Sequence, residues 1–171
     1  EVLLSCKGKI LINLDKTYEF FDQAFELAKQ TGTTHQIVMK GYDITVDKVI
    51  ADFGVKLDTI TFMPIINLDK QANPLTIIDD FQTKLKVKAF EIVFSKENPE
   101  VLNQFSAIKS KGSRVWVNSL WGELCANHED NLAVNNPDAI YGWYINKGVN
   151  MIQTDRPELL LKYLRSKGLH Q

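Results

Sequence analysis

Short apolar segments alternate with segments of helical periodicity along the whole chain. After the mainly apolar segment 10–14, for example, Tyr18, Phe21 and Phe25 recur at the spacing of one helix face. The same alternation occurs five more times. It predicts strands at residues 9–15, 35–40, 58–63, 88–94, 114–118 and 149–152, and helices at residues 17–30, 45–53, 74–85, 98–110, 137–147 and from Pro157 onward.

Strands that alternate with helices in this way predict a parallel sheet with helical crossovers. Several of the apolar segments are nearly continuous, as expected for strands that are covered on both faces. No linker or low-complexity segment interrupts residues 1–171, so we expect one α/β domain. An open doubly wound sheet and part of a (β/α)₈ barrel both fit the pattern. No GxGxxG or P-loop motif follows the first strand, which removes support for a nucleotide-binding sheet.

Composition narrows the possible partners. The 171 residues are 44% hydrophobic and carry 20 Lys and Arg against 21 Asp and Glu, so charge gives no reason to expect nucleic acid as a partner. The apolar runs are too short to span a bilayer, and no secretory signal is visible. Cys6 and Cys125 are far apart and predict two core thiols rather than a disulfide. The absence of an initial Met predicts a processed or truncated beginning.

The closing segment, residues 148–157, is a candidate phosphate site. An apolar strand leads through Thr154, Asp155 and Arg156 into a helix that begins at Pro157, and proline suits the first helical position. A helix N-terminus that follows a strand offers free amides to a phosphate. The alternative is an ordinary turn between a strand and a helix.

Polar residues at the ends of the first two predicted strands are candidates for binding a metal ion or a phosphate group. Asn13 and Asp15 are two residues apart and so share one face of the strand. A carboxylate beside an amide suits a hard divalent cation such as Mg²⁺ or Ca²⁺, although Asp15 is equally suited to cap the next helix. Lys40, at the end of the second strand, is a candidate for neutralising a phosphate oxygen, or else a solvated surface residue.

Later strands offer further candidates. Trp116 and Asn118 share one side of their strand, where Trp would form a wall for a glycerol skeleton and Asn would bind a hydroxyl group. Alternatively, Trp116 fills a barrel core or faces the helices. Glu91 would need a partner such as Lys40 or Lys16 if it lay inside a barrel, because burying an isolated carboxylate is costly. Otherwise it lies towards the helical layer.

Two of these segments resemble the glycerophosphodiester phosphodiesterase family. The closing segment is similar to the family's Gly-Val-Asp-x-Ile-x-Thr-Asp-x-Pro motif, and residues 115–121 resemble its Trp-Thr-Val-Asn segment with a spacing one residue shorter. Where the family usually has Ile-Glu-Ile-Lys, with Glu as a metal ligand, Asn13 falls at the Glu position and Asp15 at the Lys position. The resemblance covers essentially the whole chain, from the family's third strand onward.

The resemblance implies six βα units of an eight-unit TIM-type barrel. It implies a parent enzyme that uses a divalent metal, Mg²⁺ or Ca²⁺, to hydrolyse glycerophosphodiesters to glycerol 3-phosphate and an alcohol. The family's His-Arg-Gly, Glu-x-Asp and second His segments do not occur here, so the chain holds no catalytic residue and is expected to be inactive alone. A non-catalytic barrel remnant that binds phosphate or a polyol is the alternative.

The proposed substrate and metal contacts follow from the same reading. Lys40, Trp116, Asn118, Thr154, Asp155 and Arg156 would bind substrate, and Asp15 and Asn13 the metal. The resemblance also favours a periplasmic or cell-envelope location over a cytoplasmic one. If two units are missing, the sheet edges would be open and the chain is expected to self-associate.

Overall fold

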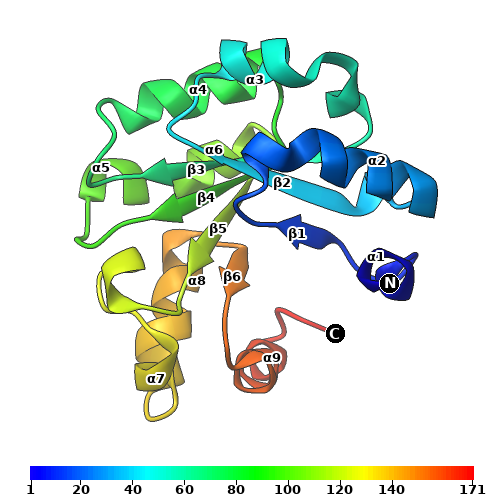
Figure 1. Ribbon diagram of the computed structural model, residues 1–171. Helices are drawn as coiled ribbons and strands as arrows, with labels where there is room; N and C mark the ends of the chain where they lie inside the picture. Colours follow the sequence, from blue (N-terminus) through cyan, green and yellow to red (C-terminus); the bar gives the residue numbers. More distant parts are fainter.

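A computed structural model describes residues 1–171 and shows one parallel six-stranded sheet (Figure 1). The strands follow one another across the sheet in chain order, which is the order of a (β/α)₈ barrel rather than of an open doubly wound sheet. Every adjacent pair is parallel. The strands are β1 (Ile12–Leu14), β2 (Ile37–Tyr42), β3 (Thr61–Asn67), β4 (Ala89–Val93), β5 (Arg114–Asn118) and β6 (Met151–Gln153).

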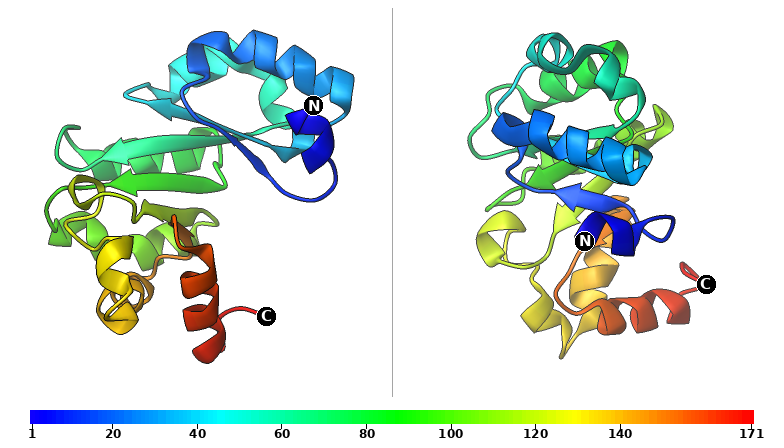
Figure 2. Two further views of the ribbon diagram at one scale, coloured as in Figure 1. Left: turned by 60° about the horizontal axis from the view of Figure 1, so that its bottom comes forward. Right: turned by 45° about the vertical axis from the view of Figure 1, so that its right-hand side comes forward.

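The sheet curls into a half-barrel with the connecting helices on its convex side, and β1 and β6 border the open side (Figures 1 and 2). None of the helices has the length and apolar character needed to cross a membrane. The α-helices are α1 (Val2–Cys6), α2 (Phe21–Thr31), α3 (Val46–Phe53), α4 (Pro74–Lys84), α5 (Pro99–Leu102), α6 (Phe105–Ser110), α7 (Asp130–Ala133), α8 (Trp143–Lys147) and α9 (Pro157–Ser166).

The two faces of the sheet have separate apolar clusters, because successive side chains of a strand point to opposite faces. The outer face carries residues such as Met39, Phe90 and Val117, which join the main core with the helices. The inner face carries a small cluster of Val38, Met63 and Ala89, with Trp116 and Met151 packed against it. The inner face is therefore only thinly covered, and it is the face on which charged side chains of the strands can meet.

Some element boundaries differ from those expected. The third strand was predicted at residues 58–63. It instead runs from Thr61 to Asn67, and residues 54–58 form a 3₁₀ helix. Pairing with β2 on one side and β4 on the other carries the strand past Pro64, whose neighbour across β2 is Gly41. The helix expected at residues 98–110 is divided into α5 and α6.

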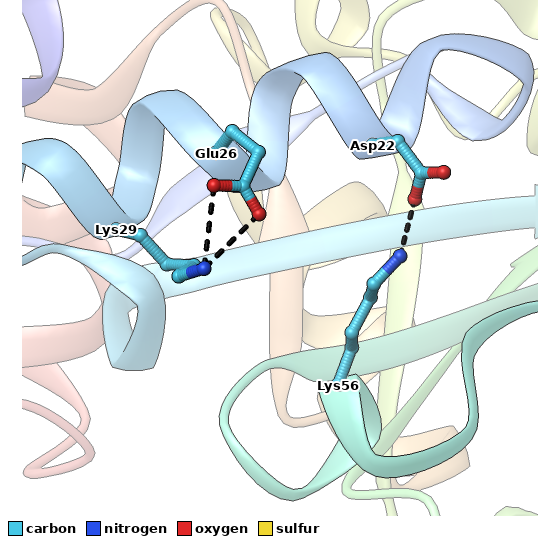
Figure 3. A network of polar contacts seen from close by, with 4 residues as sticks. All are labelled: Asp22, Glu26, Lys29 and Lys56. Atoms are coloured by element: carbon cyan, nitrogen blue, oxygen red, sulfur yellow. Dashed lines mark hydrogen bonds and ion pairs between the residues drawn. The ribbon is translucent and has the colours of Figure 1, made fainter.

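The outer surface holds solvent-exposed ion pairs (Figure 3). On α2, Lys29 contacts Glu26 one turn away, and Lys56 reaches Asp22 from the 3₁₀ segment at residues 54–58. Exposed pairs of this kind contribute about 0–1 kcal/mol each to stability. They belong to the solvated surface of the helical layer rather than to a ligand site.

The two cysteines do not form a disulfide. Cys125 is fully buried in the main core, as predicted, whereas Cys6 is only half-buried, so the prediction of two core thiols was wrong for Cys6. Burial raises the pKa of the Cys125 thiol to about 11. Cys125 is therefore a packing residue rather than a nucleophile, because the thiolate is the reactive form.

Candidate functional site

A buried lysine lies on the inner face of the sheet. The side chain of Lys40, on β2, is 4% exposed, and its Nζ lies 2.6 Å from Oε2 of Glu91 on β4, whose side chain is 6% exposed. The ammonium also lies 5.3 Å from the ring centroid of Trp116 on β5, over the ring. Charges this deeply buried occur almost only in pairs. The predicted need of Glu91 for a partner such as Lys40 is thus confirmed, and Glu91 faces the inner side.

The ion pair is close but is not completed by a hydrogen bond. Oε2 of Glu91 accepts no hydrogen bond, because the nearby ammonium is not aligned with it. The attraction between the two charges does not depend on alignment, so the two groups remain an ion pair at this distance. The ammonium has three N–H donors. It can therefore serve a further acceptor while it stays beside Glu91.

That further acceptor can approach from a hollow at the carboxyl ends of β1 and β2. The hollow has a volume of about 460 Å³, and Lys40, Asp15 and Tyr42 are among the residues that line it. Oδ1 of Asp15 lies 3.8 Å from Nζ of Lys40, and the Asp15 side chain is 56% exposed. This end of the parallel strands is where ligand sites of barrel folds are built.

The packing of the neighbouring residue explains how Lys40 is held. Gly41 follows it and faces the helices, where a Cβ atom would approach the ring of Phe62 to 2.7 Å and that of Tyr18 to 3.3 Å. The absence of a side chain at Gly41 lets both rings pack directly against β2. Because the outer side of this strand is tightly packed, the backbone that carries Lys40 has little freedom to move.

Trp116 and Asn118 lie on the inner face of β5 as a pair, but they make different contacts. Nε1 of Trp116 donates a hydrogen bond to Oε1 of Gln153 on β6 at 3.3 Å. Oδ1 of Asn118 accepts one from the backbone N–H of Leu120 at 3.0 Å, so part of its hydrogen-bonding capacity serves its own loop. The structure brings Trp116, but not Asn118, into contact with Lys40.

The predicted metal ligands Asn13 and Asp15 line different hollows. Asp15 borders the hollow at the carboxyl ends of the strands, whereas Asn13 borders a second hollow of about 320 Å³ with Trp116 and Met151. No three His, Cys, Asp or Glu side chains converge in a way that could hold a metal ion. A divalent cation takes six or more oxygen ligands, some from water. The donors of this chain therefore do not fit a complete divalent-cation site, and the metal assignment stays a prediction.

The turn predicted to bind phosphate is held by a buried aspartate. Oδ1 of Asp130 accepts hydrogen bonds from the hydroxyl groups of Ser119 at 2.7 Å, Tyr141 at 3.1 Å and Thr154 at 2.8 Å. Its Oδ2 accepts one from the backbone N–H of Asp155 at 2.7 Å. Asp130 is 3% exposed. A carboxylate of the protein itself thus occupies the position where a phosphate was expected.

The remaining part of this turn is also engaged. Nη2 of Arg156 donates to Oδ1 of Asn131 at 2.8 Å, and the backbone N–H of Arg156 donates to Oγ1 of Thr154 at 2.9 Å. Thr154, Asp155 and Arg156 therefore join the loop after β5 to the start of α9, and none of them contacts Lys40. Their assignment as substrate ligands stays a prediction.

Lys40, Glu91, Asp15 and Trp116 together form a cluster that we call the Lys40 centre. Histidines, the commonest acid–base groups, are absent from it. His128, in the loop after β5, stacks on Trp143 with ring centroids 3.8 Å apart and places Nε2 3.2 Å from Oε1 of Glu97. His35 lies in a 3₁₀ segment that precedes β2, at the opposite end of that strand from the hollow, and His170 is in the exposed C-terminal tail. All three histidines therefore lie away from Lys40, Glu91 and Trp116.

Two residues of this region were missed as site residues by the sequence interpretation. Gln153 occupies a variable position of the resembling motif, and no residue pattern distinguishes it. Asp130 is the first residue of α7, and the residues whose hydrogen bonds it accepts lie 11 to 25 positions away. No local sequence signal indicates either role.

The fold and the Lys40 centre define a curled α/β half-barrel with a charged inner face. Residues 62–164 match the model of a protein family described as a domain of unknown function, DUF4996, and the chain belongs to this family. No curated protein matches the chain in sequence.

A similar fold occurs in a crystal structure of a glycerophosphoryl diester phosphodiesterase from Parabacteroides distasonis. The TM-score is 0.73 at 16% sequence identity, and the match covers 97% of this chain and 54% of that protein. The chain thus spans about half the length of the protein that it resembles. At this identity the likeness establishes a shared fold.

Proposed function

We propose that this chain forms the ligand-binding part of a glycerophosphodiester phosphodiesterase-type barrel, in which Lys40 binds the phosphate group. The six strands would then be six of the eight βα units of the barrel. The parent protein would hydrolyse glycerophosphodiesters to glycerol 3-phosphate and an alcohol. The observation that carries this proposal is the buried ammonium on the inner face, beside a hollow at the carboxyl ends of the strands.

The surroundings of Lys40 suit a phosphorylated polyol. An ammonium acts as a point charge that several phosphate oxygens can approach. The ring of Trp116 offers an apolar wall for the carbon skeleton. The exposed carboxylate of Asp15 is an acceptor for a hydroxyl group of the ligand. Asn118, and the turn at residues 154–156, are proposed as outer contacts.

Cleavage of a diester requires more than this chain offers. General acid and base groups each contribute on the order of 10²- to 10⁴-fold to rate, and no histidine stands at the Lys40 centre. Acid–base groups would come from other segments of the barrel in a longer protein, and so would most ligands of the divalent cation that the resemblance implies. Of the two predicted metal ligands, only Asp15 borders the hollow beside Lys40, and the ammonium lies 3.8 Å from its Oδ1.

Binding of glycerol 3-phosphate to the 171-residue chain, followed by NMR, tests the proposal. We expect weak saturable binding with the largest shifts at the indole of Trp116 and at the backbone of β2. Trp116→Leu should weaken binding, whereas Trp121→Leu, at a 56% exposed tryptophan in the following loop, should not. Absence of saturable binding would refute the proposal. So would equal effects of the two tryptophan variants.

A second candidate function is a non-catalytic binder of phosphate or polyols. The positions of all three histidines favour it, because each is held outside the inner face. A longer protein that includes the preceding segment would distinguish the two. Release of glycerol 3-phosphate from glycerophosphocholine by that protein supports the enzyme, and binding of the diester without turnover supports the binder.

A further inference from the structure

We infer that the ammonium of Lys40 takes the place of a divalent cation at the phosphate site, so that this chain binds a phosphate monoester without metal. This inference rests on the proposed function, because it concerns how the same ligand is bound. It goes beyond that function because it replaces the metal expected from the resemblance with a residue of the chain.

The first argument is the position of the charge. The ammonium lies 2.6 Å from Oε2 of Glu91 on β4 and 3.8 Å from Oδ1 of Asp15, which directly follows β1. In a metal-dependent site a divalent cation would neutralise such carboxylates and attract the phosphate. Here the side chain of Lys40 already performs the first of these tasks.

The second argument is the set of available donors. Asn13 offers only a neutral amide, and it lines a different hollow from Asp15. No group of three metal-binding side chains forms anywhere in the chain. A second cation beside Asp15 would also be repelled by the ammonium only 3.8 Å from that carboxylate.

The site can accept an anion despite the two carboxylates. Glu91 is buried and compensates the charge of Lys40, whereas the Asp15 side chain is 56% exposed, so water and salt screen its charge. Asp15 can turn away or accept a hydroxyl of the ligand. One or more N–H donors of the ammonium are then available to a phosphate oxygen.

Calorimetric titration with glycerol 3-phosphate tests the inference, once in EDTA and once with Mg²⁺ or Ca²⁺. We expect the same affinity, within about twofold, under both conditions. Because Lys40→Met alone leaves Glu91 unpaired and risks unfolding, the principal variant is Lys40→Met with Glu91→Gln, checked for folding by circular dichroism. It should bind at least tenfold more weakly, since a charge-assisted hydrogen bond is lost. Lys16→Met, an exposed lysine at the same hollow, is the matched control and should change affinity less than threefold.

The outcomes are distinguishable. Binding that requires Mg²⁺ or Ca²⁺ and is lost in Asp15→Asn would overturn the inference and leave the proposed function standing. An equal loss in Lys16→Met and in the double variant would also overturn it, because binding would then reflect general positive charge. Absence of binding under every condition would refute the proposed function, and the inference with it.

Discussion

Replacing Asp130 by alanine should destabilise the protein by about 3 kcal/mol. The variant removes a buried carboxylate that accepts hydrogen bonds from Ser119, Tyr141, Thr154 and the backbone of Asp155. Ser119 can compensate, because its hydroxyl also lies 2.7 Å from the carbonyl oxygen of Gln153. The other three donors would lose their partner.

The magnitude follows from those three donors. A buried donor without a partner costs about 1–3 kcal/mol. The low end applies here, because Thr154 is half-buried and Asp155 is exposed, so water can partly replace the carboxylate. Three donors at about 1 kcal/mol each give about 3 kcal/mol. For a chain of this size that free energy lowers the melting temperature by about 6–12 °C.

Urea unfolding and thermal scans would measure the effect, with two comparison variants. Asp130→Asn keeps one oxygen and should cost about half as much, since the hydroxyl groups can turn to accept from its amide. Asp155→Ala removes an exposed carboxylate that makes no hydrogen bond and should change stability by no more than about 0.5 kcal/mol. A loss below about 1 kcal/mol for Asp130→Ala would refute the reasoning that Asp130 holds the turn after β6.

Four further predictions follow from the structure. Glu91→Ala leaves the ammonium of Lys40 buried without a partner and should lower the free energy of unfolding in urea by about 3–5 kcal/mol. The double variant Lys40→Met with Glu91→Leu should stay close to the wild type in stability. Equal losses of stability in the two variants would contradict a buried ion pair between Lys40 and Glu91. Burial, together with the nearby acidic charge, raises the pKa of Tyr141 to about 12, so its neutral form stabilises the fold below pH 10. That contribution is lost as the pH rises from about 10 to about 12, and over this range the stability of the wild type should fall more steeply than that of Tyr141→Phe. Iodoacetamide at pH 8 should modify Cys6 and spare Cys125 until urea is added, as followed by mass spectrometry, because burial raises the pKa of Cys125 to about 11. The unpaired edges of β1 and β6 should cause self-association, and a monodisperse monomer in light scattering would contradict this.

The local sequence determined the elements and their order. Apolar periodicity was enough to predict the alternation of strands and helices, because each strand must bury at least one face and each helix one stripe. Pro157 marked the start of the last helix correctly, because α9 begins at this residue. The parallel order of the strands followed as well, since crossovers of helical length connect neighbouring parallel strands.

Boundaries that depend on neighbouring strands were predicted less well. The third strand was predicted at residues 58–63, but pairing with β2 and β4 carries it past Pro64 to Asn67. Likewise, the half-buried position of Cys6 depends on how α1 packs against α2. In both cases tertiary contacts outweigh a local preference, because local propensities amount to only about 1 kcal/mol.

Only the tertiary structure decided which side chains form the site. A period of two places Lys40 on the same face as Val38, but it does not say which face is the inner one. The curl of the sheet decides this, and it joins Lys40 to Glu91 from a strand two positions away. It also assigns Asp130, rather than a ligand, to the amide of Asp155. Contacts between residues so distant in the sequence arise from packing of the whole sheet, and no local pattern encodes them.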